Sequence, residues 1–220
     1  MHRADLPPAV SAPRLRAEFV LLYLAAPLAL IAAPDAIWTA IPIGVLVALG
    51  LLAVTAGFRW RELVAGPVLG DWRFLLGFSA ATAVVCAGVM AALRPGAMLS
   101  LPRVNPELWL AVMLLYPPLS ALPQEIIYRV LFFRRYGGLF PDRRVAIAVN
   151  AGVFGLAHAF LLNWPAVAMS VAGGAAFSVA YLGREGKPGG LWPAVILHGV
   201  AGAILFSFGL GVFFYHGLAR

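Results

Sequence analysis

The sequence predicts an all-α membrane protein, a polytopic helical bundle of about seven to eight transmembrane helices. The 220 residues are 62% hydrophobic and only 11% charged, and the mean hydropathy is +0.91, whereas a soluble domain is close to half apolar and a quarter charged. Seven apolar runs follow one another along the chain, and a transmembrane helix needs about 20 mainly apolar residues. This composition excludes an ordinary soluble domain, a disordered chain and a collagen-like chain.

Apolar runs bounded by charge, proline or glycine define the expected spans. They cover residues 19–33, 37–58, 74–93, 108–133, 145–162, 166–182 and 191–214. The first run has the flanking basic and small residues of a signal peptide, but six more apolar runs follow it, which favours an uncleaved span. The fourth run is interrupted by Pro117, Pro118 and Pro123. Because neighbouring helices can satisfy the backbone groups that proline frees, two half-segments at this place would raise the count to eight.

Basic residues at the ends of the runs predict the orientation. With the N-terminus in the cytoplasm, only Arg94, Arg103 and Arg220 fall outside, and Arg129 falls within the membrane. The residues that fall inside are Arg3, Arg14, Arg16, Arg59, Arg61, Arg73, Arg134, Arg135, Arg143, Arg144, Arg184 and Lys187. This asymmetry is the positive-inside pattern, so the net charge of +7 does not indicate a nucleic-acid partner. A chain rich in Arg and Ala with one Lys favours the inner (cytoplasmic) membrane of a high-GC bacterium.

Four ionisable side chains lie inside the expected spans, namely Glu125, Arg129, His158 and His198. Such groups are costly in a bilayer and usually functional. Glu125 and Arg129 are four residues apart on a helix and can pair, and an ion pair that only joins helices is an open alternative for Arg129. At about 1.5 Å per residue, Glu125, His198 and His158 lie roughly 13, 10 and 20 Å from the cytoplasmic edge, so they can meet in one cavity that faces the cytoplasm.

These residue types suit the hydrolysis of an amide. A carboxylate and a neutral imidazole can hold and deprotonate a water molecule, and a second imidazole can donate a hydrogen bond to the developing oxyanion. A glutamate with two histidines can also bind zinc, although HExxH and its variants are absent. No serine lies in a nucleophile elbow, and the lone Cys86 excludes an internal disulfide, a cysteine-based zinc site and a CxxC pair. We expect no cofactor, and zinc stays an open alternative.

Three short motifs resemble those of the CPBP family, which groups CAAX prenyl endopeptidases and bacteriocin-processing (Abi) intramembrane proteases. Residues 123–132, with Glu125 and Arg129, resemble the family motif EExxxR. Phe154 and His158 match FxxxH, and His198 with Gly202 partly matches HxxxN. The resemblance covers about residues 105–215. It divides the chain into about three N-terminal spans (residues 1–104) and a CPBP-like protease core (residues 105–220).

The resemblance implies an intramembrane glutamic-type endopeptidase without a covalent intermediate. It assigns water activation to Glu125 and His158, an oxyanion donor to His198, and an orienting role to Arg129. The implied substrate is a membrane protein, or a lipid-anchored or C-terminally tagged peptide, cleaved near its C-terminus or at a membrane-adjacent site. The lipid bilayer is the other expected partner, and the resemblance does not identify the substrate.

Two residues depart from the family motifs. Gln124 stands where the family has its first glutamate, and an amide cannot accept a proton at working pH. Gly202 replaces an asparagine, and the loss of one oxyanion donor costs about 2.7–4 kcal/mol of transition-state stabilisation. Asn150 and Ser207 are candidates to replace that donor. Two alternatives therefore stay open: a weak or inactive membrane binding or scaffold protein of the same fold, and a transporter or proton relay.

Overall fold

The computed structural model describes residues 11–214 and confirms an all-α membrane fold. Seven helical segments are long and apolar enough to cross a membrane, namely Ala12–Ala32, Pro34–Ala53, Trp72–Leu93, Pro106–Leu139, Arg143–Leu161, Trp164–Leu182 and Leu191–Phe208. These residues form no strand, apart from an isolated bridge between Arg184 and Lys187. Arg3 and Arg220, which count in the charge asymmetry, lie outside the described residues. The orientation across the membrane stays a prediction.

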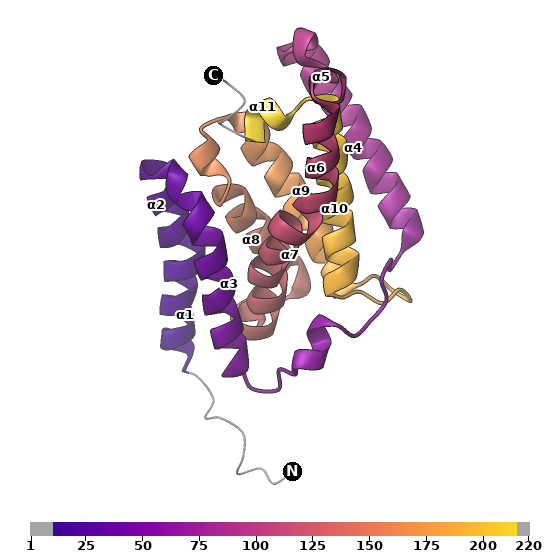
Figure 1. Cartoon of the computed structure of the whole chain (residues 1–220). Helices are drawn as coiled ribbons and strands as arrows, with labels where there is room; N and C mark the ends of the chain where they lie inside the picture. The colour runs from indigo at the N-terminus through magenta and orange to yellow at the C-terminus, as the bar shows by residue number, and fades with distance from the viewer. Residues whose placement is uncertain (1–10, 215–220) are drawn as a thin grey trace.

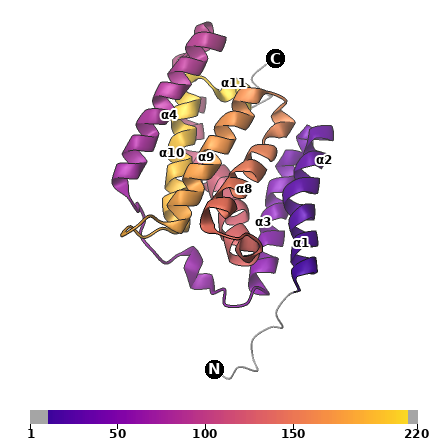
Figure 2. The same ribbon diagram turned by 180° about the vertical axis from the view of Figure 1, so that it is seen from behind.

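The first two spans lie together at one side of the bundle (Figures 1 and 2). They consist of α1 (Ala12–Val20), a wider π-helical turn η2 (Leu21–Ala25), α2 (Ala26–Ala32), the short η3 (Pro34–Ala36) and α3 (Ile37–Ala53). Tyr23 in η2 is fully buried, and its hydroxyl donates to the carbonyl of Ile127 at 2.7 Å. Its ring also packs edge-on against Phe132 and Tyr136. These contacts dock the N-terminal spans on the fourth span.

The fourth span is one continuous helical segment of 34 residues. It comprises α6 (Pro106–Tyr116), the π-helical η6 (Pro117–Ala121), α7 (Leu122–Glu125), the π-helical η7 (Ile126–Tyr136) and η8 (Gly137–Leu139). The prolines widen the helix without ending it, so the structure supports seven spans. At about 1.5 Å per residue the segment measures roughly 50 Å, more than the ~30 Å of a hydrocarbon core. It is therefore long enough to cross once and to extend beyond the core.

Three helices form the C-terminal half, namely α8 (Arg143–Leu156), α9 (Trp164–Leu182) and α10 (Leu191–Phe208). The third span, α4 (Trp72–Leu93), covers the outer side of α10 (Figures 1 and 2). A Cβ on Gly174 of α9 would lie 3.1 Å from Ala151 Cα and from Phe154 Cβ on α8. Small residues permit this close helix approach in membranes. The remaining short helices are η4 (Trp60–Leu63), η5 (Pro95–Ala97), α5 (Ser100–Val104), η9 (Ala159–Leu161) and α11 (Gly211–Phe214).

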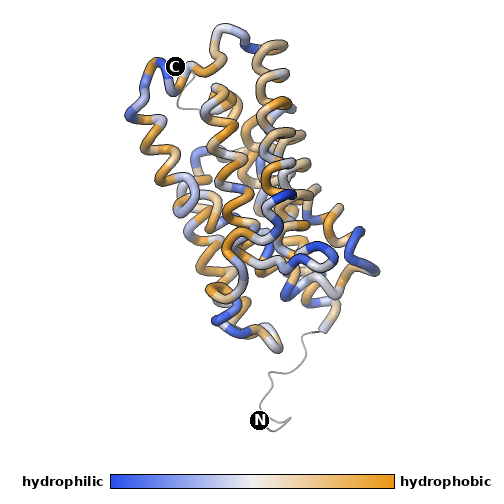
Figure 3. The backbone as a smooth tube through the Cα atoms, turned by 90° about the vertical axis from the view of Figure 1, so that its right-hand side faces the viewer, coloured by the Kyte–Doolittle hydropathy of each residue, from blue (hydrophilic) through white to orange (hydrophobic). Residues whose placement is uncertain are grey.

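Hydrophilic residues gather mainly in the loops and at helix ends (Figure 3). Among them, Arg135 of η7 forms a two-pronged ion pair with Glu18 of α1, with hydrogen bonds of 2.7 and 3.0 Å. Its neighbour Arg134 pairs with Glu62 at 2.8 Å. Two of the arginines that the charge asymmetry places in the cytoplasm thus also tie the N-terminal spans to the fourth span.

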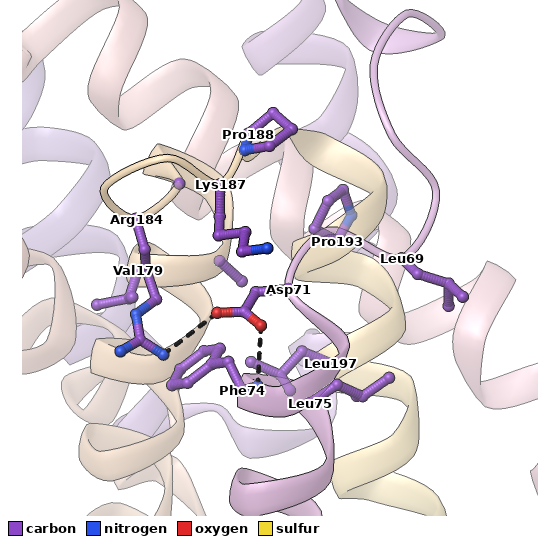
Figure 4. Close-up of a pocket in the computed structure, with 12 residues that line it drawn as sticks. Leu69, Asp71, Phe74, Leu75, Val179, Arg184, Lys187, Pro188, Pro193 and Leu197 are labelled. Atoms are coloured by element: carbon purple, nitrogen blue, oxygen red, sulfur yellow. Dashed lines mark hydrogen bonds and ion pairs between the residues drawn. The ribbon is translucent and has the colours of Figure 1, made fainter.

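Asp71 fixes the start of α4 beside the loop between α9 and α10 (Figure 4). Its carboxylate accepts from the backbone N–H groups of Arg73 and Phe74, which is the usual role of a helix N-cap. The other oxygen pairs with Arg184 at 3.5 Å. The small pocket drawn there is lined by Asp71, Phe74, Arg184 and Leu197, among others, and it belongs to the packing of the third span.

Gly174→Val tests the close approach of α8 and α9. The branched side chain has no room between Ala151 and Phe154, so we expect the free energy of unfolding to fall by about 1–3 kcal/mol, as overpacking does elsewhere. Gly152→Val is the matched control on α8, because a Cβ there meets nothing within 4 Å. Thermal unfolding in detergent, followed by circular dichroism, measures both variants. Equal losses of stability would contradict the proposed packing.

Candidate active site

Glu125 ends α7 at the point where the fourth span meets α10, and its side chain is fully buried. One carboxylate oxygen, Oε1, lies 2.8 Å from Nδ1 of His198. The other, Oε2, lies 3.2 Å from Nε of Arg129. The carboxylate is therefore held from two sides, by a residue one turn along its own helix and by a residue of another span.

Arg129 is also fully buried, and aromatic rings surround its charge. The guanidinium carbon lies 4.4 Å from the ring centre of Phe154 and 5.4 Å from that of Phe177, and aromatic faces attract a cation. Nη2 donates to the carbonyl of Gly174 at 3.4 Å. Within residues 11–214, Glu125 Oε2 and Arg129 Nε and Nη1 make no hydrogen bond. Charge attraction thus joins Glu125 and Arg129. A buried ion requires such an opposite charge nearby.

His198 connects Glu125 to a tyrosine. Its Nε2 lies 2.9 Å from the hydroxyl oxygen of Tyr116, and its ring stacks on Phe177 with 4.5 Å between ring centres. A neutral imidazole has one N–H and one acceptor nitrogen. With the hydrogen on Nδ1, His198 donates to Glu125 and accepts from the Tyr116 hydroxyl. Glu125, His198 and Tyr116 therefore form a chain of two hydrogen bonds between the fourth span and α10.

Tyr116 is not among the residues that the sequence singles out. Its signal is a phenolic hydroxyl in an otherwise apolar run, directly before Pro117. A tyrosine in such a run is usually a packing residue with a polar tip. Only the packing of α6 against α10 identifies its hydroxyl as a partner of His198.

His158 follows α8, and the ring of Phe154 separates it from the hydrogen-bonded residues Glu125, His198 and Tyr116. Its Nδ1 donates to the carbonyl of Phe154 at 2.8 Å, which leaves Nε2 as an acceptor. Its ring centre is 4.8 Å from that of Phe154, and Phe154 is 5.7 Å from His198. In the part of the chain that is described, the His158 side chain has no hydrogen bond to Glu125 or His198. The structure thus joins Glu125, Arg129 and His198 directly and separates His158 from them by Phe154.

The two departures from the motifs have different surroundings. Gln124 is partly buried, and its side-chain amide donates to Ser120 Oγ at 2.9 Å. Its side chain therefore bonds to a residue one turn back on its own helical segment. Gly202 is buried on α10, and a Cβ there would overlap the ring of Tyr116. The missing asparagine position is therefore filled by an aromatic ring from α6.

Neither candidate for the missing donor has a hydrogen bond to Glu125 or His198 among the described residues. Asn150 donates to the carbonyl of Tyr128 at 2.5 Å and accepts from Ser178 at 2.8 Å. Ser207 accepts from the indole N–H of Trp109 at 2.9 Å. Both side chains join helices elsewhere in the bundle, so the expectation that one of them replaces the asparagine finds no support in these contacts.

Comparison with known proteins gives one match. Residues 106–204 match the family model described as Rce1-like, type II CAAX prenyl endopeptidase. No curated protein and no solved structure matches the chain. The matched segment contains all three motifs, and it confirms the resemblance to the CPBP family.

Arg129→Met tests whether the buried pair is needed for folding. Removing Arg129 leaves the buried Glu125 carboxylate with its hydrogen bond to His198 but without the guanidinium charge, so we expect a loss of about 3–5 kcal/mol in the free energy of unfolding. Arg134→Met removes a partly exposed partner of Glu62 and should cost less than about 1 kcal/mol. The double variant Glu125→Leu/Arg129→Met should recover most of the loss, because no charge is left unpaired. Unfolding by heat in detergent measures all three, and a harmless Arg129→Met would refute the pair's role.

Proposed function

We propose that the protein is an intramembrane endopeptidase of the glutamic type. Its residues 106–204 match the Rce1-like family model of type II CAAX prenyl endopeptidases. The observation that supports this most is the contact of 2.8 Å between fully buried Glu125 and His198. A carboxylate and an imidazole at membrane depth are costly, and together they form an acid–base pair of the kind that hydrolases use. The proposed reaction is hydrolysis of a peptide bond near the C-terminus, or at a membrane-adjacent site, of a protein substrate.

In the proposed reaction, Glu125 removes a proton from a water molecule, and the water oxygen attacks the carbonyl carbon of the scissile amide. The charge moves to the carbonyl oxygen, to which His198 donates from Nε2 when it carries a proton there. Glu125 then gives the proton to the amide nitrogen, and the C–N bond breaks. An acid and an amine leave, no covalent intermediate forms, and water is the sole co-reactant.

Two further residues support Glu125 in this proposal. Arg129 places a positive charge 3.2 Å from Oε2 and thereby orients the carboxylate. His158 donates from Nδ1 to the carbonyl of Phe154, so its Nε2 is an acceptor that can hold the attacking water. His158 is partly exposed, whereas Glu125 is fully buried, and the water then enters from the His158 side.

The proposed substrate is a membrane protein, or a lipid-anchored or C-terminally tagged peptide, in the inner membrane of a bacterium. Large apolar side chains such as Leu46, Leu76 and Leu114 are exposed along the spans, as expected for surfaces that face lipid. The arginines bound to Glu18 and Glu62 lie on the side that the charge asymmetry assigns to the cytoplasm, together with the N-terminus. Neither nucleic acid nor a metal cofactor has a part in the proposal.

One observation favours a second candidate, a binding or scaffold protein of the same fold. Glu125 has no exposed surface, and both of its oxygens already face partners, as in an ion pair that only joins helices. The substitutions at Gln124 and Gly202 agree with that candidate. Cleavage distinguishes the two, because a scaffold binds its partner without cutting it.

Glu125→Gln is the direct test of the proposed base. The amide keeps the size of the side chain but cannot take a proton, so we expect cleavage to fall by about 10²–10⁴-fold, the usual contribution of a general base. Comparative C-terminal proteomics of membranes from cells with the wild type and with the variant reveals substrate and cut site together. His158→Ala and His198→Ala should also abolish the cut without loss of the protein from the membrane.

Glu62→Gln is the matched control for Glu125→Gln. Glu62 pairs with Arg134 outside the proposed site, so the same chemical change there should leave cleavage within about twofold, since exposed pairs contribute little. New C-termini that persist in Glu125→Gln membranes would remove Glu125 from the reaction. Stable binding of a partner that even the wild type never cuts would favour the scaffold.

Chelators test the alternative of a zinc enzyme. The described residues include no group of three His, Cys, Asp or Glu side chains arranged to hold a metal ion. We therefore expect cleavage by purified protein to continue after dialysis against a strong chelator, because the proposed reaction uses Glu125 alone as base. Loss of cleavage, with recovery on addition of zinc, would identify a metalloenzyme.

A further inference from the structure

Tyr116 and Gly202 occupy one place in the fold from two sides. His198 and Gly202 lie one helical turn apart on α10, and Tyr116 ends α6 opposite them. Its hydroxyl oxygen is 2.9 Å from His198 Nε2. A Cβ on Gly202 would overlap Cε1, Cζ and Cδ1 of the Tyr116 ring. An asparagine at position 202 and the tyrosine in its present position therefore exclude each other.

Neighbouring contacts hold the tyrosine ring where it is. The next residue, Pro117, packs against Gly199, where a Cβ would lie 3.4 Å from the proline ring. Phe206, one turn beyond Gly202, contacts the Tyr116 ring edge-on at 5.4 Å. The missing side chain of Gly202 lets α6 approach α10, and Phe206 also lies against the ring. The hydroxyl is thus positioned by packing, which is what a preorganised donor requires.

The number of N–H and O–H groups at this place shows what the Tyr116 hydroxyl contributes to binding an oxyanion. Neutral His198 has one N–H, and when it serves Glu125 from Nδ1, Nε2 presents a bare lone pair. A lone pair repels an oxyanion, so neutral His198 alone cannot stabilise one. Beside Nε2, the Tyr116 hydroxyl supplies a hydrogen for a hydrogen bond whether His198 is neutral or protonated. Tyr116 is also partly exposed, while His198 is only 4% exposed, so the tyrosine is the more accessible residue of the two.

We propose that Tyr116 is a catalytic residue that donates its hydroxyl hydrogen bond to the oxyanion, in place of the asparagine that Gly202 replaces. This rests on the proposed endopeptidase function. In the resting state the hydroxyl donates to His198 Nε2, and during attack it turns to the carbonyl oxygen of the substrate, so no proton is transferred. Gly202 is a positioning residue, because its missing side chain makes room for the ring.

Tyr116→Phe tests the proposal and keeps the ring that fills the space above Gly202. The probe is the membrane protein whose cut site the C-terminal proteomics identifies, reconstituted with purified enzyme in lipid vesicles. We expect kcat to fall by about 10²–10³-fold, as for other single oxyanion donors, with KM changed less than threefold. A merely structural hydroxyl would instead lower thermal stability and leave kcat near that of the wild type.

Tyr23→Phe is the matched control. It also deletes one tyrosine hydroxyl that donates across helices, in this case to the carbonyl of Ile127, and among the described residues this hydroxyl has no hydrogen bond to Glu125 or His198. It should lower the melting temperature and leave kcat within about twofold. An equal fall of kcat in both variants would overturn the assignment of Tyr116, because it would report a general effect of a lost hydrogen bond.

A reciprocal exchange tests the role of Gly202. Gly202→Asn alone should cut kcat at least as much as Tyr116→Phe, because the new side chain displaces the Tyr116 ring. Tyr116→Ala opens the space, and the double variant Tyr116→Ala/Gly202→Asn should be at least tenfold faster than Tyr116→Ala. A double variant no faster than Tyr116→Ala contradicts the proposed replacement.

The outcomes separate this proposal from the function on which it rests. Wild-type protein that cuts no membrane protein overturns the endopeptidase itself. Wild-type cleavage that requires Glu125 but is unchanged in Tyr116→Phe overturns only the role of Tyr116. Loss of kcat in Tyr116→Phe, with KM and melting temperature retained, supports both.

Discussion

The buried carboxylate of Glu125 is the constraint that the rest of the core satisfies. A charge at this depth needs partners, and Arg129 and His198 provide them on two sides. Arg129 in turn needs the ring faces of Phe154 and Phe177, which belong to α8 and α9. Those helices approach closely enough only because Gly174 has no side chain. One buried acidic group is therefore connected, through Arg129 and His198, to the fourth span, α8, α9 and α10.

Phe154 connects this packing to the proposed chemistry. Its ring contacts the Arg129 guanidinium, the His158 ring and the His198 ring, so the aromatic residue of the second motif contacts groups from all three motifs. Rings at these positions keep water away from the buried charges, and charges interact more strongly where the effective dielectric constant is low. Tyr116 and His158 are the partly exposed members of this group, whereas Glu125 and Arg129 are fully buried.

Composition and spacing were sufficient for the fold class, the spans and the pairing of Glu125 with Arg129, because apolar run lengths and the i, i+4 relation are local properties. They were insufficient for the contacts between spans. Tyr116 and Glu125 are nine positions apart, which sets them on opposite faces of a regular α-helix at about 100° per residue. The π-helical η6 lies between them and turns less per residue, so both reach His198. The separation of His158 by Phe154 likewise depends on how α8 packs.

The overlap between Tyr116 and position 202 also bears on ancestry. A relative with an asparagine at 202 has no room for a tyrosine ring in this orientation. The two positions are therefore expected to differ together among relatives: those with a side chain at 202 carry a smaller residue, or a differently turned ring, at 116.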